Sequence, residues 1–461
     1  MLKNFSEHQE QLERAIQASS KKDILFLFEG MHPADVADLL EQLSTEERKT
    51  LFGLIGYKGM GRVLAHLPDE QIELDIEALP PSGKALLLNQ LPDDELVDIF
   101  QHLDQGEREK LLPLLSEEKR VQVRKLLHYS ERSAGGRMTT AFAAIPETLT
   151  VDAVKAILKK DLERLEILSR IFVVDRQSRL IGKVRLRDLT FSEGHTLISE
   201  ISDDDQTSIF AENSQEEAAN LIAHYNLVAL PVVNQNGVLL GIITHDDAVD
   251  ILQQESTEDM EKIMAISSSQ SEANYLETGV LAHFRRRVGW VVSLAALGLI
   301  SGYIIFSAHN LLSHYFILTI YMPTLVAAGG NTGAQAATLV IRAMSLGELS
   351  PQQFFSVIWK EVRIGILLGG VLAVAVSAKI FLFTESSELP ENVKIWTIIL
   401  TVGLAFVLQI VTSTSIGALL PILAKASRLD PAVVASPAIT TFVDVSGLLI
   451  YFSLARLIIG A

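Results

Sequence analysis

Five apolar segments in the C-terminal part of the chain constrain its fold more than any other feature. A helix that crosses a bilayer needs roughly 20 mainly apolar residues, and each segment reaches about that length. Lipid offers the backbone no hydrogen bonds, so a spanning segment must satisfy its own, as a helix does. The segments cover 288–308, 315 through 330 and beyond, 364–383, 395–424 and 432–459. We therefore expect an all-α, five-helix transmembrane domain over residues 287–461.

The loops between these segments differ in positive charge. Lys and Arg are enriched in cytoplasmic loops, so their distribution orients the segments. The loops after the first and third segments contain a single lysine, Lys394. The stretch before the first segment and the loops after the second and fourth contain more positive residues, namely "RRR" at 285–287, Arg342, Lys360, Arg363, Lys425 and Arg428. We expect a multi-pass protein of the cytoplasmic membrane, with a cytoplasmic N-terminus and an extracytoplasmic C-terminus.

One carboxylate, Asp444, lies inside the last segment, "DPAVVASPAITTFVDVSGLLIYFSLARLIIGA". A charge at mid-bilayer is costly and persists where it faces water or a partner. Lys379 and Arg456 lie near the outer ends of their segments, so neither is expected at the same depth in the bilayer as Asp444. Five spans are few for a closed pathway in one chain, so we expect a homodimer that brings two Asp444 groups together. Asp444 is then the predicted ion-binding acid of a pore; a protonated or Ser/Thr-bonded structural acid is the alternative.

The second segment contains "PTLVAAGGNTGAQAATLVIRAM" at 323–344. Its proline, glycines and amides predict irregular backbone, which membranes tolerate where it lines a cavity. Carbonyls and the Asn331 amide would suit a hard, hydrated cation. The alternative is a Gly/Ala face that packs helices. The candidate pore-lining residues are Gly329, Gly330, Asn331, Ser436 and Thr440, with "TSTS" at 412–415 and Thr441 as further hydroxyls.

The rest of the chain is strongly acidic. The whole chain has a net charge of −17, and residues 288–461 hold seven acids against eight Lys or Arg, so residues 1–287 carry −18. This charge argues against nucleic acid or anionic lipid as the main partner and is compatible with binding many cations. The chain has no cysteine, which excludes disulfides and thiolate metal sites. "MLKNFSEHQE" lacks the apolar core of a signal peptide, so this region is expected in the cytoplasm.

Residues 1–136 show a 12-residue period. From Met31 to Leu115 an apolar residue followed by a helix-start signal, such as "LST", "LPD" or "LSE", recurs at that interval. Pro, Ser, Thr and Asp favour helix N-termini. The pattern predicts a stack of short helices that forms an α-helical superhelix.

Residues 137–253 contain a tandem repeat. "RIFVVDRQSRLIGKVRLRDL" at 170–189 aligns with "ALPVVNQNGVLLGIITHDDA" at 229–248, an offset of 59. Each unit reads strand, turn, strand, helix, and the pair resembles tandem α/β CBS domains. "GIITHDD" resembles the ribose-phosphate motif of that family, with Thr244 and Asp247 in the binding positions. In the first repeat Arg185 replaces the threonine, and Arg187, which could meet phosphates, precedes Asp188. The resemblance implies at most one complete adenine-nucleotide site, for ATP; an empty structural pair is equally compatible.

The stretch "DDAVDILQQESTEDMEKIMA" at 246–265 is helical in pattern and rich in acids. We assign residues 254–286, after the CBS pair, to an acidic connecting helix. Asp247, Asp250, Glu258 and Asp259 fall on neighbouring turns of such a helix. Like charges repel unless cations bridge them to another surface. The pattern favours a connector whose position depends on bound divalent cation; a solvated linker is the alternative.

A helical array, a CBS pair, an acidic connector and five spans that carry "GGNTGAQAATL" and "LDPAVVASPAITTFVDVSGLLIY" together resemble the MgtE family of magnesium channels. The resemblance implies a homodimer with its pore on the dimer axis, and it places the pore aspartate of the family on Asp444. It also implies that the connector is a plug helix. Regulatory Mg²⁺ sites would then map to Asp247, Asp250, Glu258 and Asp259, with Glu216 as a weaker match and Asp94 and Glu95 as candidates on the array.

The implied function is Mg²⁺ uptake that is driven by the membrane potential and closed when Mg²⁺ binds the cytosolic domains. Co²⁺, Mn²⁺ or Ca²⁺ remain possible cargo. Two other readings stay open, a membrane-anchored CBS nucleotide sensor and a proton-coupled solute carrier that uses Asp444 as its proton site. The chain shows no P-loop and no Gly-x-Ser-x-Gly motif, so an enzyme is not expected.

Overall fold

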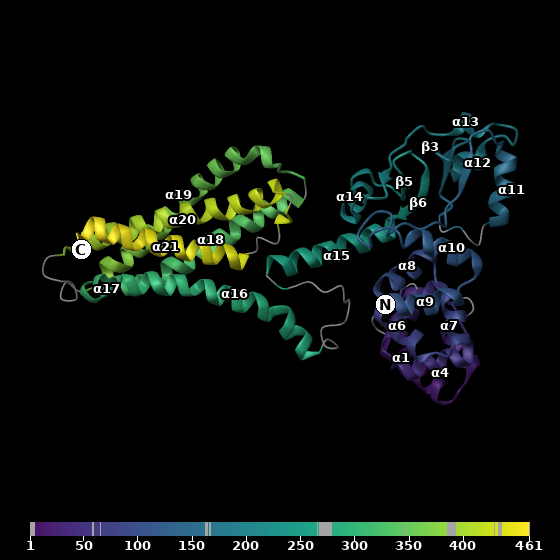
Figure 1. The fold of residues 1–461 in the computed structure, drawn as a ribbon, viewed down its shortest axis with the longest axis horizontal. Coiled ribbons are helices and arrows are strands. Elements are labelled where there is room, and N and C mark those ends of the chain that lie inside the picture. Colours follow the sequence, from purple (N-terminus) through teal and green to yellow (C-terminus); the bar gives the residue numbers. More distant parts are fainter. Residues whose placement is uncertain are drawn as a thin grey trace. The chain divides into compact units, whose positions relative to one another are not determined.

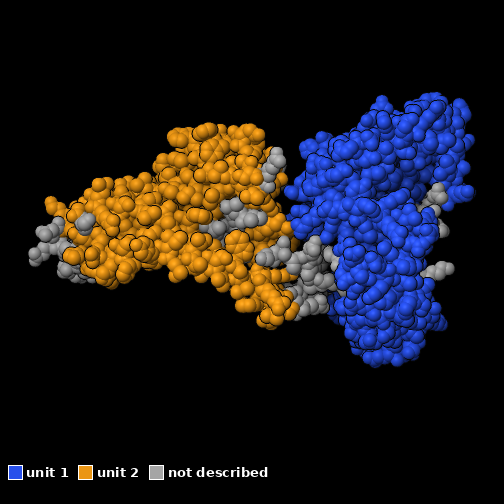
Figure 2. Space-filling model, viewed as in Figure 1, with its two compact units in different colours: residues 1–255, 271–274 blue, residues 256–270, 275–461 orange. Residues whose placement is uncertain are grey.

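The computed structural model describes residues 5–460, apart from 58–59, 65, 162–164, 166, 265, 267–278, 346, 385–392, 428 and 432–435. The chain divides into two compact units (Figure 2). One comprises residues 1–255 and 271–274, and the other residues 256–270 and 275–461.

The N-terminal part of the first unit is entirely helical (Figure 1). The α-helices that follow Met31 confirm the 12-residue period, since all but one of them begin two residues after the apolar residue of their start signal. The exception follows Ile55, where Gly56 at φ +81° ends the preceding helix. The elements are α1 (Phe5–Gln17), α2 (Lys21–Phe28), α3 (Pro33–Glu41), α4 (Thr45–Ile55), α5 (Gly61–Leu64), α6 (Asp69–Ala78), α7 (Pro81–Leu88), α8 (Asp93–His102), α9 (Gln105–Leu111), a 3₁₀ turn (Leu112–Leu114) and α10 (Glu117–Leu126).

A Leu-rich core and one buried ion pair hold these helices together. Leu40, Leu51 and Leu96 are fully buried in a cluster that continues into the second CBS repeat. Arg48 on α4 donates from Nε to both carboxylate oxygens of Asp75 on α6, each at 3.0 Å. Both side chains are almost completely buried, so the pair fixes α4 against α6.

The two CBS repeats form two similar three-stranded sheets. In each, the first two strands pair in parallel and the last two antiparallel. The register shifts at Val173/Val174 and again at Val232/Val233, the same offset of 59, which confirms the internal repeat. The elements are β1 (Ala144–Pro146), α11 (Val151–Asp161), β2 (Arg170–Val174), β3 (Leu180–Arg185), α12 (Leu186–Phe191), α13 (Ile198–Ile201), β4 (Ile209–Phe210), α14 (Gln215–Tyr225), β5 (Ala229–Val233) and β6 (Leu239–Thr244).

Helix α15 (His245–Ile263) starts directly after β6 and confirms the predicted acidic helix. It passes without a break through position 253, where the sequence suggested a boundary. Residues up to Glu255 belong to the first unit and the following ones to the second.

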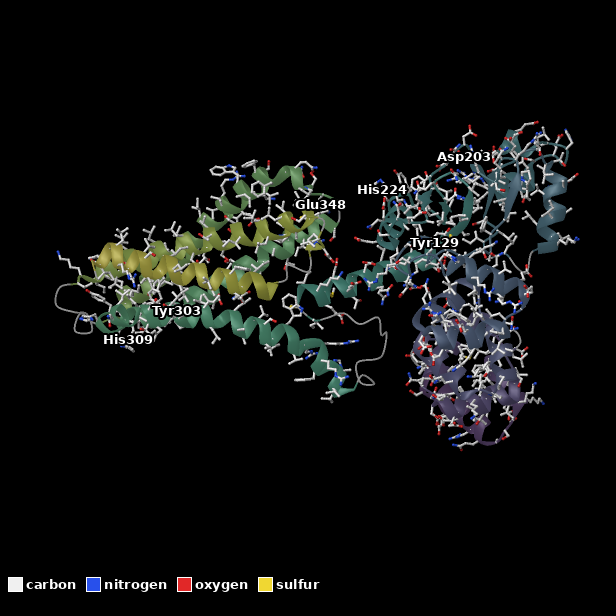
Figure 3. The ribbon with its side chains drawn as sticks, in the orientation of Figure 1. Tyr129, Asp203, His224, Tyr303, His309 and Glu348 are labelled. Carbon is white, nitrogen blue, oxygen red and sulfur yellow. The ribbon has the colours of Figure 1, made fainter. Side chains whose placement is uncertain are left out.

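The second unit is helical and centres on α20. Within the described residues, four helices are long and apolar enough to cross a membrane, namely α16 (Val280–Ser307), α19 (Phe354–Phe383), α20 (Ile395–Ala426) and α21 (Ser436–Ile459). The remaining predicted span, the second in chain order, is α18 (Ile317–Ser345), a helix of 29 residues whose glycines and polar residues lower its apolar character. Helix α20 packs against α18, α19 and α21. The connecting elements are α17 (His309–His314), which follows α16 at His309 (Figure 3), and a 3₁₀ turn (Pro351–Gln353).

The expectation of irregular backbone in the second span is wrong. Helix α18 continues through Pro323 and through the Gly329–Gly330 pair without a break. A broken helix would leave backbone groups unpaired in lipid. The glycines instead give the neighbouring helices room to approach, which is the alternative that the sequence left open.

Candidate functional site

Asp444 lies in the middle of α21 with its side chain half-buried. Its Oδ1 atom is fully buried and has no hydrogen-bond partner within the part of the chain that the structure describes. No ion pair among those residues reaches it. Lys379 instead places its ammonium 5.2 Å from the centre of the Tyr321 ring, and Arg456 is exposed about 18 Å further along the helix axis. Among the described residues, the carboxylate therefore has no neutralising cation.

Gly330 forms the wall opposite Asp444. A Cβ atom at this position would lie 2.9 Å from Thr440 Cγ2 and 3.8 Å from Asp444 Oδ1. Thr440 stands one helical turn before Asp444 and is half-buried. Gly330, Thr440 and Asp444 thus share one junction between α18 and α21, where a larger residue than glycine would push the helices apart.

Hydroxyl groups of α18 and α20 meet beside that junction. Ser413 is fully buried and donates from Oγ to the Gly329 carbonyl. Thr332 Oγ1 lies 3.2 Å from Ser413 Oγ, and Thr414 bonds the Glu361 carbonyl. Ser413 and Thr414 thus join neighbouring helices, which favours packing over a lining role for these two residues of "TSTS".

Of two further predicted lining residues, the structure describes the side chain of one. Asn331 is exposed on α18, on the face away from its buried glycines. The side chain of Ser436 lies outside the described residues.

Gln409 on α20 belongs to this region although the sequence analysis did not single it out. It is fully buried, and Nε2 donates to the Val443 carbonyl at 2.9 Å. The sequence does contain a signal for this residue. Gln409 is a lone amide inside the apolar run "AFVLQIV", and such polar residues form hydrogen bonds between membrane helices.

The first turn of α15 closes on the candidate nucleotide motif. The backbone nitrogen of Thr244 donates to Asp247 Oδ2 at 3.0 Å, and Thr244 Oγ1 donates to the same oxygen. Burial raises the pKa of Asp247, and Asp246 and Asp250 raise it further, against the bonds from Thr244. Burial and Asp246 also raise the pKa of Asp250, while His66 opposes the change. The charged carboxylate forms of Asp247 and Asp250 are thus disfavoured when no cation is bound.

The far end of α15 is tied to the membrane helices. Lys262 Nζ lies 2.8 Å from Glu258 Oε1 and 2.6 Å from Asp430 Oδ2. Burial alone would lower the pKa of Lys262, but the two carboxylates outweigh it and hold that pKa above its usual value. Ile263 packs against a cluster that contains Ile439 and Val443 of α21.

Arg137 joins the three parts of the first unit. Its Nη1 lies 2.7 Å from Asp98 on α8, its Nε donates to Gln215 on α14 at 2.9 Å, and its Nη2 donates to Gln254 on α15 at 3.1 Å. Gln215 in turn donates to Glu255 at 2.5 Å. One guanidinium therefore links the helical array, the second CBS repeat and the connector.

The remaining predicted residues are spread over several elements. Glu216 is exposed on the first turn of α14, and Glu95 is half-buried on α8. The side chain of Asp94 is outside the described part of the structure. Arg187 pairs with Asp188 at 3.2 Å, so the two meet each other on α12. Within the described ranges, no group of three or more His, Asp or Glu side chains is arranged to hold a metal ion.

Family models match most of the chain. Residues 31–132 match the MgtE intracellular N domain, and residues 134–192 and 198–254 match the CBS domain. Residues 322–454 match a divalent cation transporter model, also named MgtE.

Relatives and solved structures agree with these matches. The chain is 35% identical to the magnesium transporter MgtE of Thermus thermophilus over 454 residues, 98% of each chain. It is 28% identical to the MgtE of Bacillus subtilis over 436 residues, 94% of this chain and 93% of that one. The soluble part of a magnesium transporter aligns at 29% identity with a TM-score of 0.52, covering 55% of this chain and 99% of that chain. The cytosolic domain of the Mg²⁺ channel MgtE in complex with ATP aligns at 32% identity and 0.50, covering 53% and 99%. The chain therefore belongs to the MgtE family of magnesium transporters.

Proposed function

We propose that Mg²⁺ crosses the membrane beside Asp444, at the axis of a homodimer. One observation carries this proposal. Asp444 is a carboxylate inside a membrane helix, and one of its oxygens is buried without a partner among the described residues. A buried charge is costly unless something neutralises it, and a passing divalent cation would do so.

The protein is a transporter rather than an enzyme, with cytosolic N-terminal domains and a multi-pass membrane region. We expect its C-terminus on the extracytoplasmic side. Transport would need no chemical fuel, because an inside-negative potential favours inward movement of a divalent ion by about 4.6 kcal/mol per 100 mV.

The chemistry of the junction suits a hydrated ion. Mg²⁺ gives up its water reluctantly and binds through few carboxylates. Asp444 and the hydroxyl of Thr440 can accept hydrogen bonds from that water. Neither imidazole nor thiolate is among the predicted site residues, which disfavours a zinc site. Co²⁺, Mn²⁺ and Ca²⁺ are the competing ions to test.

Closure would come from the acidic soluble region. Cytosolic Mg²⁺ would bridge carboxylates on α15 to other surfaces and fix that helix; at low Mg²⁺ the net charge of −18 would loosen it. Exposed pairs contribute about 1 kcal/mol or less, so many ions must act together. The proposed regulatory ligands are Asp247, Asp250, Glu258 and Asp259, with Glu216, Asp94 and Glu95 as further candidates.

Binding of ATP is a finer proposal. A related cytosolic domain was solved with ATP, and the motif "GIITHDD" is present here. The bonds between Thr244 and Asp247 close the motif on itself. Equilibrium dialysis with ATP on wild type and Thr244→Val would decide it, since binding that is equal in both variants would exclude this site.

Growth of a transport-deficient strain tests the main proposal. Wild type should restore growth in low Mg²⁺, and Asp444→Ala, at equal membrane level, should not. Rescue by Asp444→Ala would remove the pore role. Uptake into proteoliposomes separates the rival readings: a nucleotide sensor would carry no cation, and a proton-coupled carrier would stop when a protonophore collapses the pH gradient under a clamped potential.

A further inference from the structure

Gln409 occupies an unusual place between three membrane helices. It is fully buried on α20, and its Nε2 donates to the Val443 carbonyl of α21 at 2.9 Å. Its Oε1 is also fully buried and has no hydrogen bond within the described residues. A buried carbonyl oxygen without a hydrogen bond lowers the stability of the fold, so stability alone does not explain this amide.

Two glycines make room for this amide. A Cβ atom at Gly329 of α18 would collide with Gln409 Nε2. At Gly447 of α21 a Cβ would lie 2.5 Å from Nε2, 2.7 Å from Cδ and 2.9 Å from Oε1. The amide is thus enclosed by bare backbone on both sides, and it cannot shift without moving α18 or α21.

The bond from Gln409 acts on the peptide that leads into Asp444. The Val443 carbonyl and the backbone nitrogen of Asp444 belong to one planar group. Ser446 Oγ lies 2.9 Å from the same carbonyl, within the same helix. Gln409 therefore fixes this peptide from α20, and a Cβ atom at Gly330 of α18 would lie 3.8 Å from the Asp444 carboxylate.

We propose that Gln409 is a positioning residue for Asp444 that sets the cation selectivity of the pore. The inference rests on the proposed function of Asp444. In a homodimer the spacing of the two carboxylates follows from the orientation of each α21. When the bond to Val443 is lost, α21 can relax, and the spacing no longer discriminates hydrated Mg²⁺ from Ca²⁺, which is larger as a bare ion and gives up its water more readily.

The test is uptake of Mg²⁺ and of Ca²⁺ by the full chain in proteoliposomes at an imposed potential, without Mg²⁺ on the cytosolic face. Gln409→Met keeps the length and removes the donor. We expect its Mg²⁺/Ca²⁺ uptake ratio to fall about tenfold, the upper range for one interhelical hydrogen bond, with a raised KM for Mg²⁺. The matched control is Thr401→Val, since Thr401 is equally buried on α20 and bonds only its own helix.

The outcomes separate this inference from the proposed function. A wild-type ratio in Gln409→Met overturns the positioning role. If that variant does not reach the membrane, Gln409→Asn decides, because it keeps the amide but shortens its reach, and a wild-type ratio there also overturns the inference. Uptake by Asp444→Asn at the wild-type rate would instead remove the proposed pore acid. Loss of selectivity in Thr401→Val as well would reduce Gln409 to general packing.

Discussion

Lys262 Nζ on α15 lies 2.6 Å from Oδ2 of Asp430. Asp430 comes before α21, the helix that carries Asp444, in the chain. Glu258 completes the contact at 2.8 Å. The neighbouring Ile263 packs against a cluster that includes Val443. The end of the connector and the start of the proposed pore helix are thus joined by charge and by apolar contact, which gives α15 a direct route to influence Asp444.

Replacing Lys262 with Met should weaken closure by cytosolic Mg²⁺. The ion pair is partly exposed, so its loss should shift the inhibitory Mg²⁺ concentration upward by up to about 5-fold. Patch-clamp recording across a Mg²⁺ series measures the shift. Lys183→Met, which removes a pair with Asp205 in the first CBS repeat, is the control. An unchanged inhibition curve for Lys262→Met would show that the contact plays no part in gating.

Arg137 should not be replaceable by lysine. Its guanidinium serves three acceptors on three helices, and a single ammonium cannot reproduce that geometry. We expect Arg137→Lys and Arg137→Gln to make the linker after α10 cleavable by protease even at high Mg²⁺. Arg14→Lys, at an exposed pair with Glu10, should remain resistant. Equal resistance of all variants would mean that Arg137 does not hold the parts together.

Asp247 should make stability depend on pH. Its pKa is raised by burial, so the folded state holds the proton more tightly than the unfolded chain does. Its ionisation therefore destabilises the fold progressively as pH rises from about 4, the unfolded value, through the raised pKa. Glu47 and Asp205, whose pKa values are lowered, act in the opposite direction, so a difference measurement is needed.

The difference is the Tm of wild type minus that of Asp247→Asn in Mg²⁺-free buffer. It should increase on acidification from pH 7 through the raised pKa towards the unfolded value of about 4, since the variant has no charge to lose there. Saturating Mg²⁺ should reduce this dependence, because the ion would replace the proton. A difference that is constant with pH would contradict the raised pKa.

The Arg48–Asp75 pair should be among the most sensitive points of the helical array. Removing one partner leaves a buried charge, so Arg48→Met should destabilise α4 and α6 by about 3–5 kcal/mol. Hydrogen exchange of the two helices measures this. Lys49→Met, at the exposed pair with Glu46, should cost less than about 1 kcal/mol. Arg48→Met with Asp75→Leu should recover most of the loss; a double variant as unstable as the single one would contradict the explanation.

Local signals made much of the fold predictable. Caps such as Ser44 with Glu47 mark helix starts within a few residues of sequence, and in the structure Ser44 is the residue directly before α4 while Glu47 lies in its first turn. The repeat also predicted two strands of each sheet, β2 with β3 and β5 with β6, but not β1 and β4, which complete the sheets. Helix α18 was misjudged because Pro323 and the glycines have low helix propensity, whereas the cost of unpaired backbone in lipid and the packing against α20 and α21 override that propensity.

The site was less predictable because its contacts join distant parts of the chain. Asp444 stood out as a lone acid in an apolar segment. Its surroundings depend on Gln409, 34 residues from the carbonyl that it binds, and on Gly330 of another helix. Arg137 and Gln254 are 117 residues apart. No spacing rule in the sequence reports such pairs, since they follow from how the helices pack.

The central claim is that Mg²⁺ crosses the membrane beside the Asp444 carboxylate, which binds it on the way. Its most direct test is Mg²⁺ uptake by proteoliposomes at a series of imposed potentials, with wild type, Asp444→Asn and the buried-hydroxyl control Thr401→Val. The account predicts potential-dependent uptake in wild type and in the control, and none above empty liposomes in Asp444→Asn. Uptake by folded Asp444→Asn with the rate and potential dependence of wild type would contradict it.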